Sequence, residues 1–185
     1  MRIIAGSARS LPLKTIDGRD TRPTTDKIKE TLFNVLQADI SSCKFLDLFA
    51  GSGQIGLEAI SRGADFCVFV ENSKKAVACI EDNIKFTKFN DKCQVLSMDA
   101  ASSINRLNGK HKFDIVFMDP PYDKQLEKDV MYQLSKSDIL EDNAIIIIEA
   151  SLNTAFDYLE ELGFEIFKYK KYKTNQHVFI HKKQE

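Results

Sequence analysis

The sequence predicts an α/β fold in which helices cover both faces of a mostly parallel, seven-stranded sheet. Two observations predict this class. Short apolar runs alternate with helical patterns through the middle of the chain, which is typical of parallel strands joined by crossover helices. The last two strand-like segments instead follow each other across a short turn. The sheet should therefore end in a C-terminal antiparallel hairpin.

Each element is expected in turn. Residues 1–20 look like a short strand-and-turn arm, and Thr24 or Thr25 should cap a helix that ends near Leu36. The next five strands are expected at 45–49, 66–70, 94–97, 113–118 and 144–149. Helices are expected at 54–61, 73–87, 101–107, 124–136 and 152–162. The hairpin strands are expected at 165–172 and 177–182, around the turn-forming pair Thr174 and Asn175.

Length and composition favour one domain. A chain of 185 residues, 43% apolar and 29% charged, can bury one substantial core. We expect a single domain over 1–185, with an N-terminal extension of arm and helix over 1–40 and the core over 41–185. No apolar run approaches the length of a bilayer span, and the four cysteines form no CxxC pair. We therefore expect a cytoplasmic protein with no membrane segment and no metal.

A Gly-rich segment directly follows the first apolar strand. Gly51 and Gly53 would let the backbone approach a nucleotide-like ligand and adopt positive φ. Glu71 ends the next strand, about twenty residues further on, where its carboxylate can bind both ribose hydroxyls. This pattern is typical of a Rossmann-like fold, and by itself it leaves a nicotinamide-dependent dehydrogenase open.

Two further acids favour S-adenosylmethionine as the cofactor. Asp47 lies within the strand that leads into the loop, where it would attract the cationic amino group of a methionine moiety and repel a pyrophosphate. Asp99, followed by Ala100, comes at the end of the third strand, where it could accept a hydrogen bond from an adenine amino group. The alternative for Asp99 is a structural role as the cap of the next helix.

The strand at 113–118 stops at Asp119-Pro120-Pro121-Tyr122. Because ligands bind at the carboxyl ends of strands in open α/β sheets, this motif and the Gly-rich loop should face the same crevice. The alternative is a strand ended by helix breakers with a surface tyrosine.

This motif suits methyl transfer to an exocyclic base amine, a poor nucleophile whose lone pair is delocalised into the ring. Asp119 and the carbonyl of Pro120 can each accept one N–H bond, and Pro121 helps to fix that carbonyl's direction. Tyr122 offers a face on which the extruded base can stack. Positioning and electrostatics would then supply most of the rate.

Five segments together resemble a known family, the bacterial small-subunit (16S) rRNA guanine-N2 methyltransferases of the RsmD type. They are 2–6, 22–24, 46–53, 58–64 and 119–122. The resemblance implies a class I S-adenosylmethionine-dependent methyltransferase acting on ribosomal RNA, within a small-subunit particle. It also implies that the cofactor binds at Asp47, Gly51, Gly53, Glu71 and Asp99, and the guanine at Asp119 to Tyr122.

Charge is concentrated at the two ends of the chain. Residues 1–30 carry seven Lys or Arg against four acids, and residues 168–185 carry six against one, although the net charge is −1. Basic ends on an acidic middle could attract phosphate. The expected RNA contacts are Arg2, Arg9, Arg22, Lys168, Lys170 and Lys171.

Three alternatives remain at this point. An adenine-N6 DNA methyltransferase of the same fold shares the Asp-Pro-Pro-Tyr motif, although no separate DNA-reading domain is evident. An NAD-dependent dehydrogenase would make that motif accidental. A catalytically silent RNA-binding module would bind RNA without transferring a methyl group.

Overall fold

The computed structural model describes residues 1–16, 25–122 and 124–184. One seven-stranded sheet has the order β3-β2-β1-β4-β5-β7-β6. Its strands are β1 (Lys44–Leu48), β2 (Phe66–Glu71), β3 (Cys93–Ser97), β4 (Phe113–Met118), β5 (Leu140–Ser151), β6 (Phe164–Lys171) and β7 (Asn175–Lys182). Neighbouring strands from β3 to β5 are parallel, whereas β7 is antiparallel to β5 and β6. The predicted sheet, with its closing hairpin, is confirmed.

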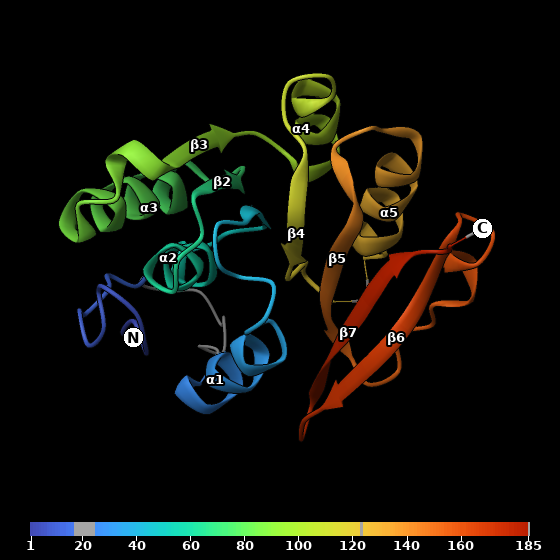
Figure 1. The fold of residues 1–185 in the computed structure, drawn as a ribbon, viewed down its shortest axis with the longest axis horizontal. Helices are drawn as coiled ribbons and strands as arrows, with labels where there is room; N and C mark the ends of the chain where they lie inside the picture. The colour runs from blue at the N-terminus through green and yellow to red at the C-terminus, as the bar shows by residue number, and fades with distance from the viewer. Residues whose placement is uncertain (17–24, 123, 185) are drawn as a thin grey trace.

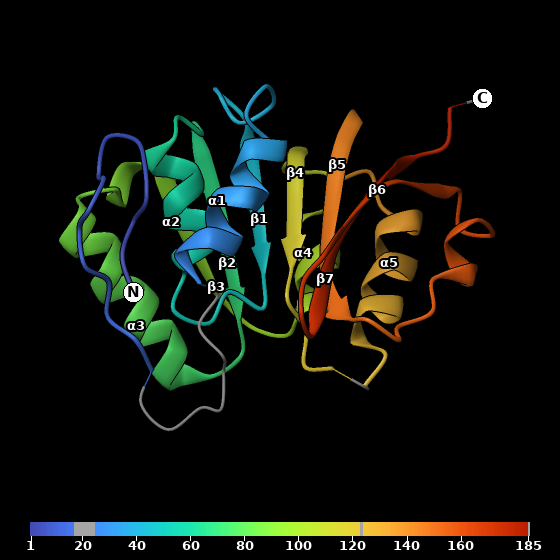
Figure 2. The same cartoon turned by 90° about the horizontal axis from the view of Figure 1, so that it is seen from below.

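Helices cover both faces of this sheet (Figures 1 and 2). On one face lie α1 (Asp26–Val35), α2 (Gln54–Ser61) and α3 (Lys74–Thr87), and on the other lie α4 (Ala100–Leu107) and α5 (Leu126–Lys136). The two faces bury separate apolar clusters. The helices in the described ranges are too short or too polar to cross a membrane.

Side-chain caps set the starts of three helices. Thr25, Ser73 and Asp99 accept hydrogen bonds from the backbone N–H groups of Ile28, Ala76 and Ser102, respectively. Each bond satisfies a donor that has no partner within its helix. Thr25 is thus the cap of α1, while Thr24 lies outside the described residues.

The N-terminal arm is attached to α1 and α2 by buried hydrogen bonds. The backbone N–H groups of Ile4 and Ala5 donate to the Glu58 carboxylate over 2.8 and 3.0 Å. Lys29 of α1 donates to the carbonyl of Arg2. Glu58 and Lys29 are both fully buried, and either would be costly to leave unpaired. This network fixes the arm's position on the core.

The prediction of a helix over 152–162 is wrong, because the structure has no α-helix in this segment. Strand β5 continues to Ser151, and Thr154 then closes a turn with it through a backbone bond of 3.2 Å and a hydroxyl contact of 3.0 Å. A single 3₁₀ turn, η2 (Asp157–Leu159), follows, after the short η1 (Asn90–Lys92) earlier in the chain. Ser, Thr, Asn and Asp side chains compete with helical hydrogen bonds in this way, so the helical spacing of the apolar residues does not decide the structure.

Candidate active site

The Gly-rich loop has the backbone that its sequence predicts. Gly51 and Gly53 have φ of 58° and 79°, in the left-handed region that glycine adopts without strain. A Cβ added at Gly51 would meet nothing within 4 Å, whereas one at Gly53 would lie 3.3 Å from Phe69 and Ile80. Gly51 thus faces open space, whereas Gly53 is needed where the loop packs against the core.

Asp47 lies beneath this loop with only 1% of its surface exposed. Its carboxylate accepts the backbone N–H of Gly56 over 2.9 Å. Burial, which outweighs that hydrogen bond, raises the pKa of Asp47 to about 7. Asp47 therefore ties β1 to the first turn of α2, a contact that the strand pattern alone did not reveal.

Glu71 joins the loop to the end of β2. Its two carboxylate oxygens accept the backbone N–H groups of Gly51, at 3.0 Å, and Ser73, at 2.9 Å. The side chain is 5% exposed and still reaches the wall of the adjoining pocket. Glu71 thus supports the Gly-rich loop and is available to a ligand there.

A pocket of about 270 Å³ opens beside the loop. It includes three of the sequence-predicted cofactor residues, Glu71, Asp99 and Ala100. Asp99 also caps α4, and the N–H of Ser102 that it accepts lowers the pKa of Asp99. Both interpretations of Asp99, as a cap and as a pocket residue, are therefore compatible with the structure.

Sequence reasoning missed several residues of this pocket. They come from the ends of β-strands, from the first turn of α4 and from the face of α5 that turns toward α4, namely Phe49, Val70, Asn72, Met98, Ala101, Leu126, Asp129 and Val130. The α5 residues carried no usable signal, because their contribution depends on how α5 packs. Phe49 has a φ of 60°, a conformation that non-glycine residues mostly adopt at functional sites or turns.

The Asp-Pro-Pro-Tyr motif lies next to this loop. Met118, the last residue of β4, pairs with Leu48 on one side and Ile148 on the other. Asp119 therefore occupies the next position in line, between Phe49 and Glu149. Of the motif, Pro120 is buried, whereas Asp119, Pro121 and Tyr122 are exposed. The expected proximity of the two motifs is present.

Asp119 is accessible to solvent by surface area, yet surrounding protein atoms remove much of the hydration of its carboxyl group. This desolvation, followed by the charges of Glu149 and Asp47, raises the pKa of Asp119 well above its usual range. The side chain is thus exposed to a substrate and has a greater affinity for a proton than a free aspartate.

A buried polar network that sequence reasoning missed lies behind Asp119. Glu149 accepts the Asn175 amide over 2.7 Å and the His177 Nε2–H over 3.1 Å, and the Tyr122 hydroxyl lies 3.5 Å away. His177 Nδ1 in turn lies 3.2 Å from the Tyr172 hydroxyl. The pairing of Glu149 with His177 across β5 and β7 was the missing information, because neither residue belongs to a recognisable motif.

The basic residues at the two ends do not form one patch. The arm lies over α2 and α3, through contacts with Ser61 and Asn83, whereas β6 is the opposite edge of the sheet (Figures 1 and 2). Arg2 and Arg9 are exposed on the arm, and Arg2 pairs with Asp26 at 2.9 Å. Arg22 lies outside the described residues.

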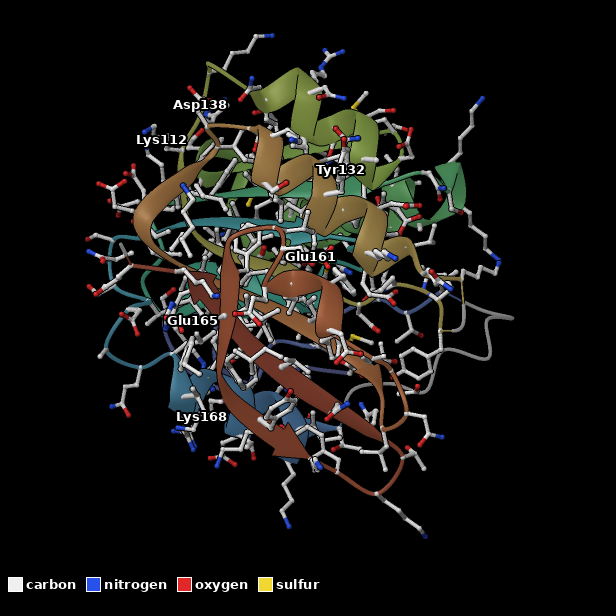
Figure 3. All side chains as sticks on the ribbon, turned by 90° about the vertical axis from the view of Figure 1, so that its right-hand side faces the viewer. Lys112, Tyr132, Asp138, Glu161, Glu165 and Lys168 are labelled. Atoms are coloured by element: carbon white, nitrogen blue, oxygen red, sulfur yellow. The ribbon has the colours of Figure 1, made fainter. Side chains whose placement is uncertain are left out.

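The three lysines of β6 are divided between the two faces of the sheet. Lys170 is the cross-strand neighbour of His177, which in turn is the cross-strand neighbour of Glu149. Lys170 therefore lies in the same row and on the same face of the sheet as that carboxylate. Lys168 shares this face, and Figure 3 shows it on the side of the sheet where α1 lies. Lys171, one residue beyond Lys170, points to the other face.

Comparison with known proteins identifies the family of this chain. The family described as conserved hypothetical protein 95 matches residues 1–181. Ribosomal RNA small subunit methyltransferase D from Haemophilus influenzae is 35% identical over 150 residues, 80% of this chain and 78% of that protein. The Escherichia coli protein of the same name is 35% identical over 152 residues, 82% and 75% of the two chains.

Solved structures agree with this assignment. The Escherichia coli protein yhhF superposes with a TM-score of 0.87 at 30% identity, covering 98% of this chain and 97% of that one. Ribosomal protein L11 methylase from Lactobacillus delbrueckii shares the fold, with a TM-score of 0.70 at 17% identity over 85% and 78% of the two chains. The chain is therefore a methyltransferase and belongs to the RsmD-like family of the small subunit methyltransferase D proteins.

Proposed function

We propose that this chain transfers a methyl group from S-adenosylmethionine to the exocyclic N2 amine of a guanine in small-subunit ribosomal RNA. The observation that carries the proposal is the position of Asp119 beside Phe49, which lines the pocket. The names of the relatives support ribosomal RNA as the substrate.

The pocket residues fit the cofactor. Glu71 would bind the ribose hydroxyls, while Asp99 and Ala100 would contact the adenine edge, all three from the pocket wall. The open space at Gly51 leaves room for the methionine moiety, and the Asp47 carboxyl beneath the loop, with a pKa raised to about 7, would be partly ionised there near neutral pH. When bound, the cofactor supplies a methyl group on a positively charged sulfur, which needs no further activation.

The Asp-Pro-Pro-Tyr motif would orient the amine. Asp119 and the Pro120 carbonyl each accept one N–H, so that the nitrogen lone pair points toward the methyl carbon, and Pro121 stiffens the backbone. Tyr122, 41% exposed, would stack on the base. Transfer would form the N–C bond and break the donor's S–C bond, whose electron pair stays on the departing thioether. The amine would then lose one proton, which Asp119 is suited to accept because its pKa is raised.

The basic residues would bind the phosphates around the target. Lys168 and Lys170 share the face of the sheet that carries Asp119 and Glu149, which favours them over Lys171. Arg2 and Arg9 would contact a second part of the RNA on the other side of the site, and Arg22 remains an expectation from the sequence. Such divided contacts suit a folded ribosomal substrate in the cytoplasm.

Labelled methyl transfer tests the proposal. Small ribosomal subunits from cells that lack the gene are incubated with the protein and labelled S-adenosylmethionine, and the rRNA nucleosides are then separated. We expect the label in N2-methylguanosine. Label in N6-methyladenosine instead would contradict the guanine assignment.

A further inference from the structure

Glu149 is a nearly buried carboxylate at the active site to which the steps above assign no role. It is 7% exposed and follows directly after Ile148, the partner of Met118 across β4 and β5. Glu149 and Asp119 are therefore side by side, on the same face of neighbouring strands that lie about 4.8 Å apart. Any base whose amine reaches Asp119 also comes close to Glu149.

The network around Glu149 holds it in one orientation and keeps it an acceptor. Asn175 and His177 donate to different oxygens of the carboxylate, and Tyr172 fixes the other side of the His177 ring. A carboxylate has about four acceptor positions. Within the described part of the chain, two short bonds and the long Tyr122 contact use at most three of them, which leaves an acceptor for a substrate.

Two adjacent acceptors distinguish guanine from the other amino-bearing bases. Guanine has an N1–H donor beside its N2 amine, whereas adenine and cytosine have a ring nitrogen acceptor beside theirs. A ring acceptor facing a carboxylate would be desolvated without a hydrogen bond and repelled by the negative charge. Sites built around such a donor reject analogues that lack it strongly.

We propose that Glu149 is a specificity-determining residue, which accepts the N1–H of the target guanine while Asp119 accepts an N2–H. This inference rests on the proposed function. It explains how an Asp-Pro-Pro-Tyr site, which by itself suits any exocyclic amine, selects guanine. Asn175 and His177 act as positioning residues that hold Glu149 in place.

The test compares guanine with 2-aminopurine, which keeps the 2-amino group but has an acceptor at N1. Both bases are placed at the methylated position in otherwise identical synthetic rRNA segments assembled into small-subunit particles. The measured quantity is the ratio of kcat/KM for guanine to that for 2-aminopurine. We expect this ratio to exceed about ten in the parent protein and to fall at least about tenfold in Glu149→Gln, because the glutamine amide can donate to the N1 of 2-aminopurine.

Glu165→Gln is the matched control, since Glu165 is an exposed carboxylate of β6 that forms an ion pair with His181 at 3.4 Å. It lies five residues along β6 from Lys170, which is the cross-strand neighbour of His177. This substitution should leave the ratio unchanged. An unchanged ratio in Glu149→Gln would overturn this inference but not the proposed function. Equal methylation of both bases by the parent protein would overturn it as well, and this result needs no variant. Absence of transfer to guanine by the parent protein overturns the proposed function itself.

Discussion

Asp119 directly follows β4 and Glu71 is the last residue of β2, but their surroundings give them different tasks. Asp119 is exposed beside the site, and the structure gives its carboxylate no hydrogen bond to another described residue that would fix a structural role. Glu71 is buried and binds two backbone N–H groups. Substitution should therefore affect turnover at the first position and both ligand binding and stability at the second.

Asp119→Ala should lower turnover at least about a hundredfold, while the affinity for S-adenosylhomocysteine stays within a few fold. The lost interaction matters mainly in the transition state, so kcat should fall with kcat/KM. Asp119→Asn should retain more activity because its amide oxygen still accepts one N–H. Methylation by the alanine variant at the parental rate would show that Asp119 only ends the strand.

Glu71→Ala should weaken S-adenosylhomocysteine binding by about 1.5–3 kcal/mol, since charged hydrogen bonds to the ribose are lost. It should also lower the free energy of unfolding, because the N–H groups of Gly51 and Ser73 lose their acceptor. Glu71→Gln is the comparison, because it keeps an acceptor oxygen and should lose less of both. Calorimetry and urea unfolding separate the two effects, and unchanged affinity in a folded alanine variant would exclude Glu71 from the cofactor site.

The buried Asp47 predicts a pH dependence of stability. Its pKa rises from an ordinary 3.8 to about 7 on folding, so the folded state binds more protons than the unfolded state between these values. The stabilisation is fully present below pH 4 and is lost as pH rises through about 7. Asp47→Asn, whose amide oxygen can still accept the Gly56 N–H, should remove this part of the slope.

Unfolding free energies measured from pH 4 to pH 8 provide the test. Over this range the parent should lose on the order of 2–4 kcal/mol more stability than Asp47→Asn. Asp99→Asn is the control, because the pKa of Asp99 is lowered on folding and its contribution has the opposite sign. Parallel curves for the parent and Asp47→Asn would exclude a raised pKa at Asp47.

At the scale of elements, the sequence predicted what local patterns determine. The strand at 113–118, the helix at 54–61 and the hairpin are present, because apolar alternation, glycines and turn residues act over a few positions. The prediction of a helix at 152–162 is wrong, because Ser151 and Thr154 form a turn there although the apolar residues have helical spacing. The Glu149 network could not be predicted, because it depends on the pairing of strands distant in sequence.

The attachment of the arm depends on one glycine. Gly6 has a φ of 86°, and a Cβ there would lie 1.8 Å from the carbonyl oxygen of Ser61, a backbone atom that cannot move aside. Gly6→Ala should therefore destabilise the protein by about 2 kcal/mol or more, through strain and loss of the arm's contacts. Gly109→Ala is the matched control.

Gly109 has a comparable φ of 71°, but a Cβ there meets nothing within 4 Å. Its replacement should cost only the backbone strain, about 1 kcal/mol. Thermal unfolding of the two variants isolates the contribution of packing. Equal losses would mean that the contact with Ser61 does not hold the arm.

For the whole molecule, the proposed RNA contacts fall in two separate basic regions, and this separation would determine how RNA binds. The arm and the β6 edge lie on opposite sides of the active site, and the net charge is −1. A substrate that reaches both must have a fixed three-dimensional shape, with the target loop between the two contacts.

We therefore expect assembled small subunits to be methylated faster than protein-free rRNA, and duplex DNA not to be methylated. A single-stranded loop that is already presented also avoids the cost of extruding a paired base, which is a few kcal/mol.

Affinity for the subunit should fall steeply with salt as phosphate contacts release counterions, while affinity for S-adenosylhomocysteine barely changes. Lys170→Ala should reduce the slope of log affinity against log salt concentration by about one. Lys110→Ala is the control and should leave this slope unchanged, because the exposed Lys110 precedes β4 and lies at the amino end of that strand, away from the site. An unchanged slope in Lys170→Ala would show that Lys170 of β6 does not bind RNA. Faster methylation of DNA than of subunits would contradict the ribosomal substrate, although the assignment of the fold would still hold.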